Sequence, residues 1–240
     1  MIKSQSRDYL KSYNVRILLH FYFVFKRKKI EKKLKTQYKR LKMNRENSQF
    51  KCIELCMRGN VMLSLNRHQE SISFFDQAIK IDPNFADAYN NKGIVLDVLG
   101  KFQDAIYCFD RAINLKPMDA DPLNNKGLSL ANLKKVEEAL VCFKKAVSVD
   151  PSYYRAPYNA GGMLHKIGRN QEAILYYDQS IEINPNDSEL HFNKGNVFIE
   201  LGEFKKAIQC YNKATELSPN DPDGWFNKGN ALAELDVIHF

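Results

Sequence analysis

A pattern of 34 residues repeats along most of this chain and constrains its fold more strongly than any single motif. Five copies follow one another without a gap, at residues 52–85, 86–119, 120–153, 154–187 and 188–221, and a partial sixth copy occupies residues 222–240. In the second copy, Ala105, Phe109 and Ala112 recur at helical spacing after a break at Gly100. Each copy is therefore predicted to form a hairpin of two helices.

Proline and glycine fall where a helical hairpin tolerates them. One proline stands near the end of every full copy: Pro83, Pro117, Pro151, Pro185 and Pro219. The other three lie in the first turn of a first helix, where a missing N–H is harmless: Pro122, Pro157 and Pro222. A glycine holds the eighth position of each copy: Gly59, Gly93, Gly127, Gly161, Gly195 and Gly229. A wrong register would place these residues inside helices, where they are costly.

These positions resemble the tetratricopeptide repeat (TPR) family, which has small residues at positions 8, 20 and 27, large apolar residues at 4, 11 and 24, and proline at 32. The second copy matches with Tyr89, Gly93, Leu96, Ala105, Phe109, Ala112 and Pro117. The resemblance covers residues 52–240 and implies an all-α fold, a right-handed superhelix (solenoid) of helical hairpins. It also implies that positions 2, 5, 6, 9, 12 and 13 of the first helices line a concave groove.

The positive charge is confined to the N-terminal segment. Residues 1–43 contain 14 Lys and Arg against Asp8 and Glu31, a charge of +12, so the remaining residues carry −4 of the total +8. A nucleic-acid-binding surface would need basic residues clustered on the folded part. We therefore expect no nucleic-acid partner.

Residues 1–51 lie outside the repeat, and several interpretations of them stay open. Residues 15–25 are mostly apolar but shorter than the ~20 residues that span a bilayer. Residues 26–43 are rich in lysine and carry an apolar stripe at helical spacing: Ile30, Leu34, Tyr38 and Leu41. The segment could be a solvated tail or a single helix folded onto the first repeat, or translation could start at Met43. Alternatively, residues 15–43 could make weak contact with an anionic membrane surface.

The five cysteines do not follow the pattern of a disulfide framework. Cys108, Cys142 and Cys210 share position 23 of their copies, which indicates a packing position. Cys52 and Cys56 are four residues apart, but no second Cys or His pair follows at the spacing of a zinc site. We expect reduced thiols, a cytoplasmic location or a peripheral membrane one through the N-terminal segment, and no metal or cofactor.

Asparagine recurs at position 6, which the resemblance places in the groove: Asn91, Asn125, Asn159, Asn193 and Asn227. A series of side-chain amides can bind the backbone of an extended peptide whatever its sequence, because an amide both donates and accepts hydrogen bonds. Alternatively, these asparagines form local hydrogen bonds and recur through gene duplication. Aromatic residues at position 5 extend the predicted peptide-binding site: Tyr158, Phe192 and Phe226.

Two other activities are disfavoured. A clamp for a carboxylate-terminated tail needs several basic residues at positions 2, 5 and 6, and only Arg155 is basic there. The histidines occupy unrelated repeat positions, with no triad or acid–base pair recurring beside them, so we predict no catalytic residues. The predicted function is a non-enzymatic scaffold that binds a protein or peptide. The alternative is a recognition arm or fragment of a larger TPR enzyme resembling O-linked GlcNAc transferases.

Overall fold

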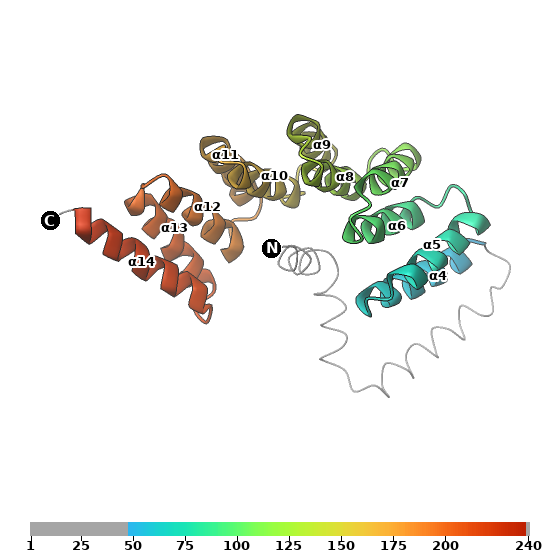
Figure 1. Cartoon of the computed structure of the whole chain (residues 1–240), viewed down its shortest axis with the longest axis horizontal. Coiled ribbons are helices and arrows are strands. Elements are labelled where there is room, and N and C mark those ends of the chain that lie inside the picture. The colour runs from blue at the N-terminus through green and yellow to red at the C-terminus, as the bar shows by residue number, and fades with distance from the viewer. Residues whose placement is uncertain (1–47, 239–240) are drawn as a thin grey trace. The chain divides into compact units, whose positions relative to one another are not determined.

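The computed structural model describes residues 48–238, and all of the regular secondary structure in that range is helical (Figure 1). The helices are α4 (Ser48–Ser64), α5 (His68–Ile81), α6 (Ala86–Val98), α7 (Phe102–Leu115), α8 (Ala120–Asn132), α9 (Val136–Val149), α10 (Arg155–Lys166), α11 (Asn170–Ile183), α12 (Ser188–Glu200), α13 (Phe204–Leu217) and α14 (Pro222–Ile238). The all-α prediction is confirmed. The expected membrane contact of residues 15–43 and the possible start at Met43 lie outside the described residues.

The second helices begin at a constant interval of 34 residues, from His68 through to Phe204. The first helices follow the same interval to within one residue from Ala86 onward. No helix between Ser48 and Ile238 combines the length and the apolar character needed to cross a bilayer.

The chain divides into two compact units, residues 1–117 and residues 118–240. In the described part of the first unit, α4 pairs with α5 and α6 pairs with α7, while α6 also packs on both α4 and α5. In the second unit, α8 pairs with α9, α10 with α11 and α12 with α13, and α14 packs on α13 (Figure 1). First helices of successive hairpins also touch, α8 with α10 and α10 with α12.

The core of each hairpin is an aromatic ring packed against the glycine at position 8. The rings belong to position 24 and are at most 2% exposed: Phe75, Phe109, Phe143, Tyr177 and Tyr211. A Cβ atom built on Gly93 would lie 2.6 Å from the ring of Phe109, and one on Gly195 would lie 2.6 Å from the ring of Tyr211. Glycine is therefore required for the two helices to approach this closely.

The turn between the two helices of a hairpin has one residue in the left-handed region. Gly100, Gly168 and Gly202 adopt φ of 74°, 77° and 70°, while Asn66 and Lys134 hold the same place with φ of 59° and 62°. Glycine is the residue that this conformation favours. Lys134 is the one residue of the five that is neither glycine nor asparagine, so it is the least suited to its backbone conformation.

Candidate functional site

The eight residues predicted to contact a partner all lie on first helices. They are Asn91 on α6, Asn125 on α8, Tyr158 and Asn159 on α10, Phe192 and Asn193 on α12, and Phe226 and Asn227 on α14. Within residues 118–238, the contacts of α10 with both α8 and α12 bring several of these side chains into one neighbourhood.

Two of the asparagines link neighbouring hairpins. Asn159 Nδ2 donates to Asn124 Oδ1 at 2.8 Å, and Asn193 Nδ2 donates to the hydroxyl of Tyr158 at 3.2 Å. Both acceptors occupy position 5 of the preceding copy. The amide donors are thus used within the fold. No hydrogen bond to Oδ1 of Asn159 or Asn193 occurs among the described residues.

The residue at position 5 of one copy determines which hydrogen bond the asparagine at position 6 of the next copy makes, as Asn91 and Asn227 show. Asn91 hydrogen-bonds to the thiol of Cys56, which again holds position 5 of the preceding copy. Asn227 follows a copy with Phe192 at that position, a side chain that accepts no hydrogen bond. Its Nδ2 instead donates to the backbone carbonyl four residues earlier, at 2.8 Å. The expected local hydrogen bonding of asparagine therefore occurs at Asn227.

Asn125 differs from the other four because it is buried, with 6% of its surface exposed. Its Oδ1 lies 3.4 Å from Nδ2 of Asn124, which is itself 1% exposed and accepts from Asn159. The amides of α8 and α10 thus form one network. Asn125 is the least accessible of the five asparagines predicted to meet a partner.

The hydroxyl of Tyr158 joins α10 to α12 through two hydrogen bonds. It accepts from Asn193 and donates to Glu189 Oε1 at 2.7 Å. Burial, together with the neighbouring carboxylate of Glu189, raises the pKa of Tyr158 well above its ordinary value. The hydroxyl therefore stays protonated at neutral pH and keeps its role as a donor to Glu189.

Of the three aromatic residues at position 5, Tyr158 and Phe192 are partly buried and Phe226 is exposed. The rings of Tyr158 and Tyr177 lie 6.1 Å apart, and those of Phe192 and Tyr211 lie 5.8 Å apart. Phe226 on α14 is 69% exposed. Its neighbour Trp225 is 50% exposed, and its indole N–H donates to the carbonyl of Pro219 at 2.9 Å. The end of the second unit therefore presents apolar aromatic surface to solvent.

The lysine after the asparagine forms an ion pair with the preceding hairpin. Lys92 Nζ lies 2.6 Å from Asp76 Oδ1, and Lys194 pairs with Asp178 in the same way. Burial lowers the pKa of Lys92, but the Asp76 carboxylate raises it more, so the net shift is upward. These pairs were not predicted from the sequence. The available signal was an aspartate at position 25 one copy before each of these two lysines.

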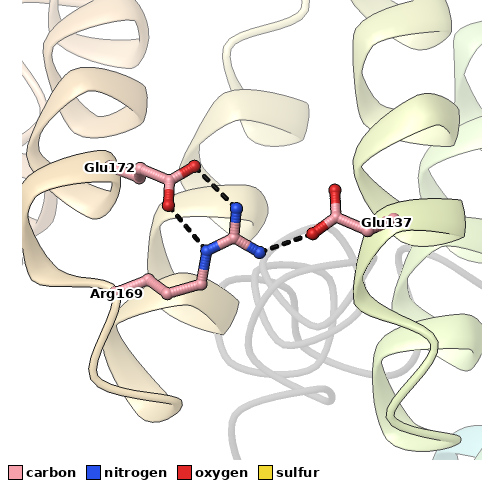
Figure 2. Close-up of polar contacts among 3 residues, drawn as sticks. All are labelled: Glu137, Arg169 and Glu172. Atoms are coloured by element: carbon pink, nitrogen blue, oxygen red, sulfur yellow. Dashed lines mark hydrogen bonds and ion pairs between the residues drawn. The ribbon is translucent and has the colours of Figure 1, made fainter.

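A further ion-pair cluster joins α9 to α11 (Figure 2). The guanidinium of Arg169 donates to both carboxylate oxygens of Glu172, at 2.6 and 2.7 Å, and to Glu137 Oε1 at 2.6 Å. Figure 2 shows the side chain of Arg169 reaching between the two glutamates. These hydrogen bonds raise the pKa of Arg169, and the Arg169 guanidinium lowers the pKa of Glu172. The cluster links the hairpin of α8 and α9 to the hairpin of α10 and α11. All three side chains form hydrogen bonds within it.

The cysteines are free thiols inside the hairpins. Cys52, Cys56, Cys108 and Cys142 are buried, and Cys210 is partly buried. Burial raises the pKa of Cys56 to about 12 and that of Cys108 to about 11, so both are protonated and unreactive at neutral pH. Between residues 48 and 238, no three His, Cys, Asp or Glu side chains come together as a metal site would require.

Comparison with protein-family models places these hairpins in a known class. A model described as TPR repeat matches residues 59–96 and 195–236, and models described as tetratricopeptide repeat match residues 86–119, 120–153, 154–187 and 176–209. The chain belongs to the tetratricopeptide repeat family. This confirms the resemblance predicted from the sequence. A search of curated protein sequences finds no match.

Solved structures of TPR proteins share the fold at low sequence identity. YrrB, described as a TPR protein with an unusual peptide-binding site, is 23% identical, with a TM-score of 0.55 over 80% of this chain and 97% of its own. TTC0263, a TPR protein of Thermus thermophilus, is 19% identical, with a TM-score of 0.61 over 76% and 99% of the two chains. Pseudomonas aeruginosa PilF is 19% identical, with a TM-score of 0.65 over 78% and 89%. The predicted fold class, an all-α TPR superhelix, is confirmed.

Proposed function

We propose that the repeat array, residues 52–240, is a non-enzymatic interaction scaffold that binds an extended protein segment along the first helices of the second unit. The observation that carries this proposal is the state of the amides of Asn159 and Asn193. Their Nδ2 groups are bound to the preceding copy, so each amide is held in one orientation and its oxygen is available to a backbone N–H of the partner. Fixed acceptors lose little conformational entropy on binding.

The aromatic side chains supply the apolar part of the proposed contact. Phe226, which is 69% exposed, has enough free surface to anchor an apolar side chain of the partner, and Phe192 lies one copy earlier. Contacts of this kind contribute more to affinity than polar contacts at the rim of an interface. YrrB, whose described peptide-binding site is built on the same fold, supports the proposal by similarity.

The test begins with affinity capture, followed by mapping of the partner to its shortest binding segment and measurement of its dissociation constant. Changing Asn159 and Asn193 together to alanine should weaken binding about 4- to 100-fold, the product of the two single effects, while the helical circular dichroism signal is retained. Asn159→Ala or Asn193→Ala alone should weaken binding about 2- to 10-fold, the value of one hydrogen bond. Phe226→Ala should weaken binding about 10-fold or more, because a phenylalanine anchor is lost.

Matched variants separate loss of contact from loss of stability. Asn124→Ala breaks the same hydrogen bond as Asn159→Ala, and Tyr158→Phe breaks the same bond as Asn193→Ala, but both leave the position-6 amide in place. We expect each control to lose less affinity than its partner variant, because the amide is no longer held in one orientation but its oxygen is still present. If each control loses as much affinity as its partner variant, the asparagines act only through the fold and the proposed contact is wrong.

The thiols favour a reducing compartment as the site of this function. Four of the five cysteines are buried and all five are free. Free, buried thiols are typical of proteins kept under reducing conditions. We therefore propose a cytoplasmic location, which fractionation of cells expressing the full chain would test.

A further inference from the structure

Helix α10 contains a glycine that neither packing nor backbone conformation requires. Gly162 lies inside the helix, where glycine is costly compared with alanine, and its φ is negative. Among the described residues, a Cβ atom built on Gly162 would have one neighbour within 4 Å outside the adjoining turns of its own helix. This neighbour is the hydroxyl oxygen of Tyr177 on α11, at an ordinary van der Waals distance of 3.6 Å. The ring of Tyr177 instead requires Gly161, where a Cβ atom would lie 3.0 Å from it. Alanine would therefore fit in place of Gly162, and the fold does not account for this glycine.

The next hairpin shows what a side chain at this place can do. Position 9 of that copy is Asn196, and position 24 is Tyr211. The Tyr211 hydroxyl donates to Asn196 Oδ1 at 2.7 Å. Gly162 and Tyr177 hold the same two positions in the hairpin of α10 and α11, but glycine has no side chain to accept a hydrogen bond. Within residues 48–238 the Tyr177 hydroxyl makes no hydrogen bond.

The Tyr177 hydroxyl is a donor that lacks an acceptor in the described part of the chain. Tyr177 is 2% exposed, and burial together with the charge of Glu189 raises its pKa well above the ordinary value, so the hydroxyl is protonated at neutral pH. A polar group of a buried side chain costs free energy when it has no hydrogen-bond partner. The carboxylate of Glu189 disfavours an anion here, since the same charge raises the pKa of Tyr177. The acceptor that suits this hydroxyl is therefore a neutral oxygen such as a carbonyl.

Gly162 lies beside the residues of the proposed peptide contact. It is three residues after Asn159 and four after Tyr158, so the three are neighbours on the surface of α10. The side-chain oxygen of Asn159 is an acceptor for a backbone N–H, and the Tyr177 hydroxyl adds a donor near it. Extended backbone carries one N–H and one C=O per residue, so these two groups complement it. Because glycine has no Cβ atom, the backbone of a partner can approach the helix closely at this point.

We propose that Tyr177 and Gly162 form a carbonyl subsite, in which the hydroxyl donates to a backbone carbonyl of the partner and the partner's backbone lies against Gly162. This inference deepens the proposed function and rests on it, since the subsite belongs to the same groove. The subsite explains two exceptions together: the glycine that the fold does not need and the hydroxyl that the fold does not use. It also distinguishes this copy from the next one, where Asn196 accepts from the tyrosine.

Nuclear magnetic resonance of the full-length protein tests the subsite with acetyl-tetraglycine amide, a probe that carries backbone groups and no side chains. The protein is labelled with carbon-13 at tyrosine Cζ, whose chemical shift responds to hydrogen bonding of the hydroxyl. Titration with the probe should shift the Tyr177 signal until it saturates. The Tyr211 signal should stay in place, because that hydroxyl is already bound to Asn196.

The same titration separates the subsite from the proposed function. No saturable shift at Tyr177, or an equal shift at Tyr211, would overturn the subsite. Saturable shifts of the side-chain amides of Asn159 and Asn193 without one at Tyr177 would overturn the subsite alone, and the proposed function would stand. A shift at Tyr177 without shifts at the two asparagines would support the subsite and contradict the asparagine contacts.

Matched variants measure what the subsite contributes to binding of the partner segment mapped by affinity capture. Tyr177→Phe removes the donor and keeps the ring, and Phe143 shows that the fold accepts phenylalanine at this repeat position. Gly162→Asn reproduces the pair of Asn196 and Tyr211, so it occupies the hydroxyl and fills the space beside it. Tyr177→Phe should raise the dissociation constant about 2- to 10-fold, the value of one hydrogen bond, and Gly162→Asn at least as much. Circular dichroism of both variants should match that of the wild type.

Two further variants complete the test. Tyr211→Phe removes a hydroxyl that is used within the fold, so it should lose less affinity than Tyr177→Phe. The double variant Tyr177→Phe with Gly162→Asn should lose no more than Gly162→Asn alone, because both changes remove the same contact. Unchanged affinity in Tyr177→Phe, an equal loss in Tyr211→Phe, or additive losses in the double variant would each overturn the proposal.

Discussion

The close contact between Gly127 on α8 and Phe143 on α9 predicts a large effect from adding a single methyl group. A Cβ atom on Gly127 would lie 2.6 Å from Cε1 of the Phe143 ring and 2.9 Å from both Cδ1 and Cζ. Carbon atoms pack best at about 3.5–4.0 Å. Phe143 is 1% exposed, so its ring has no free space into which to move.

The expected size follows from two opposing effects of Gly127→Ala. Alanine is better than glycine inside a helix by about 1 kcal/mol. Overpacking a buried contact costs about 1–3 kcal/mol, and three ring atoms within 3 Å place this site at the upper end of that range. We therefore expect the free energy of unfolding to fall by about 1–2 kcal/mol.

Gly229→Ala is the matched control. Gly229 holds the same repeat position in α14, but no atom lies within 4 Å of the Cβ that alanine would add. Only the helix propensity changes, so this variant should gain up to about 1 kcal/mol. Gly161→Ala should fall between the two, because its Cβ would lie 3.0 to 3.2 Å from the ring of Tyr177.

Urea-induced unfolding followed by far-ultraviolet circular dichroism measures these differences. Gly127→Ala and Gly229→Ala should differ by about 2–3 kcal/mol. Combining Gly127→Ala with Phe143→Leu should recover part of the loss, since the smaller side chain makes room for the methyl group. If Gly127→Ala is as stable as Gly229→Ala, the ring and the glycine do not set the distance between the two helices.

Three further predictions concern single side chains. Lys134→Gly should raise the unfolding free energy by up to about 1 kcal/mol. A φ of 62° costs a non-glycine residue about 1–2 kcal/mol, and glycine removes that cost. Part of the gain is offset because glycine loses more conformational entropy on folding. Lys92→Ala should lower it by up to about 1 kcal/mol at low salt by removing the ion pair with Asp76, and less at high salt. Cys56→Ala should reduce the loss of stability between pH 9 and pH 10 by about 1 kcal/mol in urea titrations.

The sign of the alkaline effect follows from the protonation of the thiol. Burial raises the pKa of Cys56 to about 12 from an ordinary value of 9.0. Below pH 9 the thiol is protonated in both the folded and the unfolded chain, so its contribution does not change. Above that pH the unfolded chain loses the proton first and stability falls by about 1.4 kcal/mol per pH unit until the folded pKa is reached. An unchanged pH dependence in Cys56→Ala would contradict this account.

The other two predictions have controls at the partner of the ion pair and at the matching turn position of another copy. Asp76→Asn should weaken the protein as Lys92→Ala does, and the double variant should cost less than the sum of the two. Gly168→Lys should destabilise the protein by about as much as Lys134→Gly stabilises it, because both act on the same left-handed turn position. Additive effects at the ion pair, or a neutral Gly168→Lys, would contradict these expectations.

The fold could be predicted from the sequence because the repeat supplies many independent observations of one structure. A single glycine or proline is ambiguous, but Gly59 and its counterparts at position 8 occur at a fixed interval, opposite an aromatic residue at position 24. Only one hairpin register satisfies all of them. The left-handed turn at Lys134 could not be predicted from that residue alone, because lysine carries no signal for positive φ.

The candidate site was harder to predict because its residues interact between copies rather than within one. Asparagine at position 6 indicated a polar surface, but its donor is directed by position 5 of the copy before it. That partner is a thiol at Cys56, an amide at Asn124 and a hydroxyl at Tyr158. Three different chemical groups in one role give no motif that a reading of single copies would detect.

Asn-Lys-Gly triplets occupy positions 6 to 8 of four copies and begin at Asn91, Asn125, Asn193 and Asn227. They raise the question of whether these residues recur only because the copies were duplicated. In the copy at residues 154–187 the triplet is Asn159, Ala160 and Gly161, and position 25 of the preceding copy is Lys144 instead of aspartate. The lysine is absent where its carboxylate partner is absent, which duplication alone does not require. Asn159 and Gly161 are retained, and their partners, Asn124 and the ring of Tyr177, are also present.

The partial last copy departs from this pattern, because its lysine is present although position 25 of the preceding copy is not an aspartate. Lys228 follows a copy with Asn212 at position 25, so it has no aspartate to pair with, and its ammonium lies 4.9 Å from the centre of the Trp225 ring. Asn227 likewise turns to the backbone where Phe192 provides no acceptor. Each side chain of the triplet therefore contacts a different neighbouring residue. Asn159 and Asn193 link neighbouring hairpins whether or not a partner is bound. An alanine variant of either asparagine therefore changes stability as well as any contact with a partner. Its affinity has to be compared with that of the variant that removes the acceptor of the same hydrogen bond, Asn124→Ala or Tyr158→Phe.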